Sequence, residues 1–100
     1  MQPVLPTSFQ EFASLVVRQT ADLERTQPTR GSPEWYLLNH LQDLRQNVAS
    51  SSTAAGVANS VKAVGRFVTD SLEWNSALAK GAWLIVEAHG ALLQAEKRAP

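Results

Sequence analysis

Four valines in the second half of the chain recur at steps of four, three and four residues: Val57, Val61, Val64 and Val68. This spacing is typical of one face of a helix, although valine by itself favours strands. The same register continues unbroken to residue 92, and neither proline nor glycine occurs between Arg66 and Lys80. The pattern therefore predicts an all-α protein with a long last helix over about 54–97, for which Thr53 is the expected cap.

A break near residues 70–75 is the alternative. Asp70 and Glu73 could cap a fresh helix start, which would give four shorter helices and a compact bundle. We favour the continuous helix, bent near Ser71 and about 66 Å long at 1.5 Å per residue. Two shorter helices cannot cover all sides of a helix of that length, so we expect a second copy or a partner to cover the rest.

Start and stop signals define those two shorter helices. Ser8 and Glu11 form a capping-box pattern ahead of helically spaced apolar residues, which predicts a helix over 8–26. Ser32-Pro33 predicts the start of a second helix over 33–49. Residues 1–7 are expected to be an extended lead-in. The whole chain, residues 1–100, is thus predicted to be one domain, an antiparallel bundle of three helices, or of four if the last one breaks.

Composition restricts the classes of function. Nine basic and nine acidic residues give a net charge of +0, and no basic cluster precedes Lys97-Arg98, so we expect no nucleic-acid partner. The absence of cysteine excludes disulfides, thiol catalysis and cysteine-based zinc sites. The most apolar run, residues 81–86, is too short to cross a bilayer, and the opening residues lack a signal-peptide pattern. We expect a soluble cytoplasmic protein with no membrane partner.

Motifs for chemistry are missing from the sequence. No Gly-x-Ser-x-Gly elbow occurs, and Gly31 stands alone in its loop, so it builds no phosphate cradle. His40 and His89 fall on different predicted helices without carboxylates at metal-ligand spacing. We therefore expect a non-enzymatic protein with no catalytic residue, no metal and no cofactor. His89 is expected to be a core or interface histidine that a neighbouring group satisfies.

A seam along the third helix is the predicted contact with a second copy of the chain. Polar residues within such a seam often fix register and oligomeric state. The seam consists of Val57, Val61, Val64, Val68, Asn75, Leu78, Ile85, His89 and Leu92.

Trp83 lies off this seam. At 100° per residue it is about 140° from Leu78, which we place at the centre of the buried face. It lies beside Lys80 and Glu87, so we expect an exposed tryptophan, as is typical of a binding hot spot. The alternative is a wide helix face that meets two neighbours within the bundle. The predicted partner-binding residues are Trp83, Lys80, Glu87, Trp35 and Tyr36, the last two because they lie off the apolar line of their own helix.

Two functions are consistent with these features. The first is a protein–protein interaction protein (an adaptor, inhibitor or regulator) that acts through helical surfaces, most simply as a homodimer. The second is a helical domain that binds a small apolar ligand between helices, near Trp74 and His89.

Overall fold

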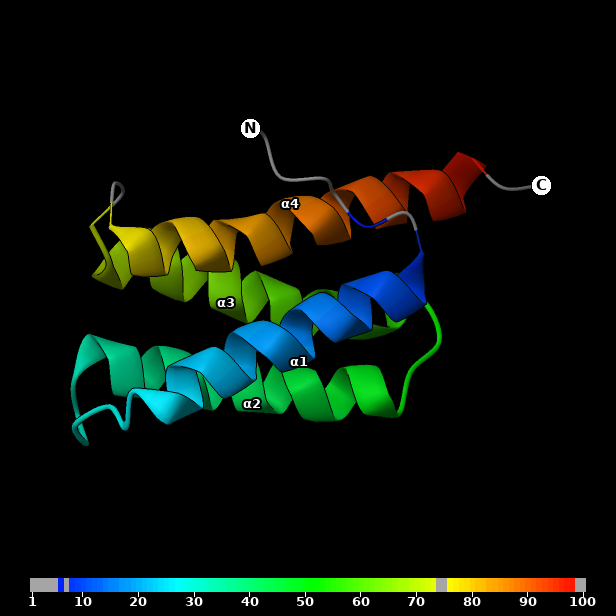
Figure 1. Cartoon of the computed structure of the whole chain (residues 1–100). Helices are drawn as coiled ribbons and strands as arrows, with labels where there is room; N and C mark the ends of the chain where they lie inside the picture. Colours follow the sequence, from blue (N-terminus) through cyan, green and yellow to red (C-terminus); the bar gives the residue numbers. More distant parts are fainter. Residues whose placement is uncertain (1–5, 7, 74–75, 99–100) are drawn as a thin grey trace.

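In the part of the chain that the structure describes, four antiparallel α-helices pack side by side (Figure 1). The computed structural model describes residues 6, 8–73 and 76–98. Within these ranges the helices are α1 (Phe9–Arg25), α2 (Pro33–Ala49), α3 (Ala58–Ser71) and α4 (Ala77–Arg98), with a 3₁₀ turn, η1 (Ala55–Val57), ahead of α3. The all-α prediction is confirmed. The predicted lead-in lies outside the described residues apart from Pro6.

The first two helices begin where their capping serines predict. Ser8 Oγ accepts a hydrogen bond from the Glu11 amide (3.1 Å), and Ser32 Oγ accepts one from the Trp35 amide (3.2 Å). Pro33 occupies the first turn of α2, where its missing N–H removes no helical hydrogen bond. These contacts satisfy backbone groups that a helix start otherwise leaves unpaired.

The connection from α1 to α2 requires unusual backbone angles. Gln27 follows the last turn of α1 with φ +49°, and Gly31 has φ +87°. This left-handed region suits glycine and is unfavourable for a glutamine. The predicted end of the first helix is confirmed to within one residue, since α1 ends at Arg25.

The favoured continuous third helix is wrong, and the four-helix alternative is correct. α3 ends at Ser71, after which Leu72 adopts an extended conformation (φ −118°, ψ 151°). Asp70 does not cap the next helix, because it lies in the last turn of α3. Ser76 does so instead: its Oγ accepts a hydrogen bond from the Ala79 amide (3.1 Å). Folding back at this point lets α4 bury its apolar face against the same chain.

The third predicted helix also starts later than expected. Thr53 Oγ1 accepts a hydrogen bond from the Gly56 amide (3.2 Å) of the 3₁₀ turn, so the predicted cap does not cap an α-helix. Regular α-helix begins only at Ala58.

The predicted seam lies inside the single chain. Its buried members are Val57, Val61, Val64, Val68, Ile85, His89 and Leu92, while Leu78 is half-buried and Asn75 lies outside the described residues. Ile85, fully buried, marks the centre of the covered face better than Leu78, which lies in the first turn of α4. Helices of the same chain cover this face, so the reason for expecting a dimer no longer applies, and dimerisation stays a prediction.

A salt bridge ties α1 to α2. Both terminal guanidinium nitrogens of Arg45 donate to the carboxylate of Glu24 at 2.9 Å, and the Gln42 side-chain amide donates to the same carboxylate at 3.1 Å. The hydrogen bonds from Arg45, then the one from Gln42, lower the pKa of Glu24 from 4.5 to about 2.

Among the described helices, none is long and apolar enough to cross a membrane.

Candidate functional site

Four aromatic rings gather on the outer surface of α2 and α3. Trp35 and Tyr36 meet edge to face with ring centroids 5.1 Å apart, and Tyr36 lies 6.5 Å from Phe67 of α3. The His40 ring lies 5.2 Å from the same phenylalanine. Tyr36 is 48% exposed, a high value for so large an apolar side chain. Water-accessible aromatic clusters of this kind provide much contact area for a binding partner.

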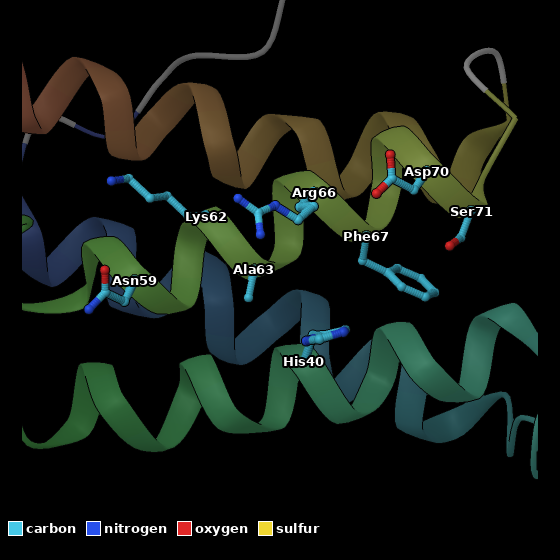
Figure 2. A pocket seen from close by; sticks show the side chains of 8 residues that line it. All are labelled: His40, Asn59, Lys62, Ala63, Arg66, Phe67, Asp70 and Ser71. Carbon is cyan, nitrogen blue, oxygen red and sulfur yellow. The ribbon is translucent and has the colours of Figure 1, made fainter.

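An open groove lies between α2 and α3 beside these rings, with a volume of about 470 Å³. Figure 2 shows the side chains of His40, Ala63 and Phe67 in the space between the two helices, and those of Lys62, Arg66 and Asp70 along the other side of α3. We call this feature the α2–α3 groove; it is lined by His40, Asn59, Lys62, Ala63, Arg66, Phe67, Asp70 and Ser71.

The groove is formed mainly by one side of α3. Ala63, Phe67 and Ser71 occupy successive turns of that helix, and His40, one turn after Tyr36, lines the groove from α2. The two helices are held in register at the other end of the groove, where the Asn47 amide donates to Ser60 Oγ and the Ser60 hydroxyl donates to Asp43. Ala63, being small, leaves the middle of the groove open.

The charged side of the groove has a definite order. Three charged residues follow one another at four-residue steps along one side of α3: two are positive, Lys62 and Arg66, and the third, Asp70, is negative. All three side chains are exposed. The salt bridges in the described part of the chain are Arg25–Asp22 and Arg45–Glu24, so these three charges have no ion-pair partner within it. They are available to an outside ligand.

The predicted partner-binding residues fall on two separate parts of the molecule. Trp35 and Tyr36 belong to the aromatic cluster beside the groove. Trp83, Lys80 and Glu87 lie on α4, across the bundle from α2 (Figure 1). The five residues therefore do not form one surface.

The expectation of a free Trp83 is wrong. Its side chain is half-buried and packs against the core, whereas Lys80 and Glu87 are exposed. The cause is the width of the covered face of α4, which packs on both α3 and α1. The alternative of a helix meeting two neighbours within the bundle is the one that the structure supports.

His89 is a satisfied core histidine, as the sequence predicts. Its Nε2 lies 2.7 Å from the carbonyl oxygen of Ala54, and its ring packs 5.9 Å from that of Phe12. With a carbonyl as acceptor, this nitrogen must carry the proton. No group of three or more metal-ligating side chains occurs within the described residues.

Glu96 of α4 also binds the segment that contains Ala54. Its carboxylate accepts hydrogen bonds from the backbone amides of Ala54 and Ala55, the latter at 3.2 Å. A carboxylate at this position satisfies free amides and faces the positive end of the helix dipole. Two side chains of α4 thus fix the connection between α2 and α3.

A second, smaller hollow lies where α1, α2 and α4 meet. Its volume is about 250 Å³, its apolar lining includes Leu23, Leu37, Leu41 and Leu78, and Gln19 and Asp22 form part of its rim. We call it the α1–α4 cleft. A Cβ added to Gly81 would lie 2.9 Å from Gln19 Oε1, the end of a flexible side chain, so a larger residue here would have to displace only the Gln19 amide.

Ser71 and His40 both line the α2–α3 groove, and no hydrogen bond of the described structure joins them. None of the residues that line the groove was predicted as a site residue. The signal was present in the sequence: Ala63 and Phe67 occupy a second helical stripe beside the valine line.

Comparison of the chain with known protein families, with curated protein sequences and with solved structures found no match.

Proposed function

We propose that this chain is a non-enzymatic protein–protein interaction protein that binds a partner through the α2–α3 groove. The observation that carries the proposal is the pairing of a partly exposed aromatic cluster with charges that have no ion-pair partner among the described residues. Binding hot spots are enriched in tyrosine, tryptophan and arginine; Trp35 and Tyr36 lie beside the groove, and Arg66 lines it.

Tyr36 is the natural anchor of such a contact. It is half-exposed, and it touches both Trp35 and Phe67, so a partner that covers it would bury a connected aromatic surface. Hot-spot residues of this type contribute about 2 kcal/mol or more to binding when truncated to alanine. Removing a side chain that is already half in water should cost the fold much less.

Affinity capture tests the proposal, with the intact protein as bait in extracts of the cells that make it. Tyr36→Ala should lose the captured partner while keeping its helical circular dichroism. Val17→Ala is a matched control, because Val17 is 47% exposed but lies on α1, outside the groove. If both variants capture as the unaltered protein does, the groove is not the binding surface.

Three finer points remain predictions. Homodimerisation no longer follows from a half-covered helix, and light scattering across a dilution series tests it directly. A cytoplasmic location follows only from composition. Whether the protein serves as an adaptor, an inhibitor or a regulator depends on what the captured partner does.

The α1–α4 cleft favours a second candidate function, the binding of a small apolar ligand. Its leucine lining and polar rim match the general character of small-molecule sites, although about 250 Å³ is small for one. The expected place near Trp74 and His89 stays a prediction: His89 is buried in the core and lines neither this cleft nor the groove, and Trp74 lies outside the described residues. A ligand that binds the folded state raises the melting temperature as its concentration rises. Indole is a suitable probe, and an unchanged melting temperature at millimolar indole would count against this function.

A further inference from the structure

The shape of the α2–α3 groove suits an additional helix. Its lining on α3 runs from Asn59 to Ser71, a length of about 18 Å at 1.5 Å per residue. That is the length of about three helical turns. A helix laid along two neighbouring helices is a recurrent mode of peptide recognition, in which an apolar face enters the groove. Ala63 leaves room for such a helix midway along α3.

The apolar and charged parts of the groove are separated. Ala63 and Phe67 line it along the edge of α3 that faces α2, whereas Lys62 and Arg66 line it along the opposite edge of the same helix (Figure 2). A ligand that fills the groove therefore meets an apolar strip on one side and a charged strip on the other. An amphipathic helix has this division built into its surface.

Charge complementarity fixes the sequence pattern of the occupant. Opposite Lys62 and Arg66 the ligand needs two acidic residues one turn apart, and opposite Asp70 it needs a basic residue one turn further. Such complementarity between surfaces sets specificity and association rate more than affinity. The negative end of the strip also disfavours a nucleic acid, which would present phosphates to all three residues.

We propose that the α2–α3 groove takes an amphipathic helix of a protein partner, with two acidic residues four positions apart over Lys62 and Arg66 and a basic residue over Asp70. This inference rests on the proposed function and names the class of partner. A second copy of this chain does not fit the pattern, because no two of its nine acidic residues are four positions apart.

Selection from a library tests the inference without knowledge of the partner. Random 18-residue peptides displayed on yeast are enriched on the intact protein and counter-selected on Ala63→Trp, which fills the groove from an exposed position. The enriched peptides should carry acidic pairs four residues apart with apolar neighbours. They should bind the Lys62→Glu, Arg66→Glu double variant at least tenfold more weakly, and the control Arg18→Glu, an exposed residue of α1 outside the groove, with unchanged affinity.

Selection repeated on the double variant should enrich basic pairs instead. Peptides without acidic pairs, proline-rich peptides, or binding that ignores the charge reversal would overturn the inference. So would the absence of any enrichment over the counter-selection, or a dimer of the protein that Ala63→Trp abolishes. If affinity capture still yields a partner that depends on Tyr36, the proposed function stands and only the class of partner is wrong.

Discussion

Replacing His89 by alanine tests how far the core depends on one polar side chain. The imidazole is buried, donates to Ala54 and packs against the ring of Phe12. The hydrogen bond contributes about 0.5–1.5 kcal/mol net, at the lower end because Ala54 O keeps a second bond from the Val57 amide at 3.2 Å. Truncating a buried side chain of this size adds about 2–5 kcal/mol through lost packing and the cavity left behind.

The expected loss is therefore about 3 kcal/mol or more in the free energy of unfolding. For a domain of this size, that corresponds to a fall of about 12 °C or more in melting temperature. Urea unfolding followed by circular dichroism measures the change, and the slope with denaturant should stay constant if the variant remains two-state.

His40→Ala is the matched control. This second histidine is half-buried, contacts Phe67 and makes no hydrogen bond within the described structure, so its loss should cost less than about 1 kcal/mol. If the two variants were equally stable, His89 would not be the core residue that its contacts indicate. His89→Leu should recover part of the loss, because leucine refills the space without the donor.

Burial also predicts which residue of α4 contributes more to stability. Ile85→Ala should lower the free energy of unfolding by about 2–5 kcal/mol, and Leu78→Ala should lower it distinctly less. Equal losses in thermal melts would show that α4 is rotated about its axis. Gln27→Gly should raise the free energy of unfolding by about 0.5–1 kcal/mol, because the strain relieved at φ +49° exceeds the extra chain entropy that a glycine loses on folding. Gly31→Ala should lower the free energy of unfolding, because alanine is strained at φ +87°. Thermal melts in which both changes act in the same direction would contradict this account of the loop. The folded-state pKa of Glu24 is below its ordinary value, so the stability from this group is present above pH 4.5 and is lost as the pH falls towards about 2. Urea unfolding between pH 7 and pH 2 should therefore show a shallower acid loss for Glu24→Gln than for the unaltered protein, and identical slopes would mean that the ion pair does not form in solution.

Local signals in the sequence predicted most of the fold. Ser8 and Ser32 mark helix starts because a capping hydroxyl acts within three residues of itself, and such a contact can be read without tertiary information. The break between α3 and α4 was harder to predict, because the seam register passes through it unchanged. Ser76, the residue that caps α4, was overlooked in favour of Asp70, although serine is equally good at that position.

The candidate site depends on packing between helices, which single-helix reasoning does not capture. Trp35 and Tyr36 were predicted because they lie off the apolar line of α2. Phe67 and Arg66 become part of the same surface only when α3 lies beside α2. Trp83 shows the opposite effect, because contact of α4 with two neighbours covers a side chain that a one-sided helix would expose.

The hydrogen bonds from Ala54 and Ala55 to Glu96 join residues more than 40 positions apart. Both amides precede regular α-helix, so no turn of their own helix protects them from solvent. Their protection from hydrogen–deuterium exchange thus depends on α4 being docked. The exchange rates of these two backbone protons report how often α4 detaches, at a place far in sequence from α4 itself. These two amides therefore allow the detachment of α4 to be measured separately from global unfolding.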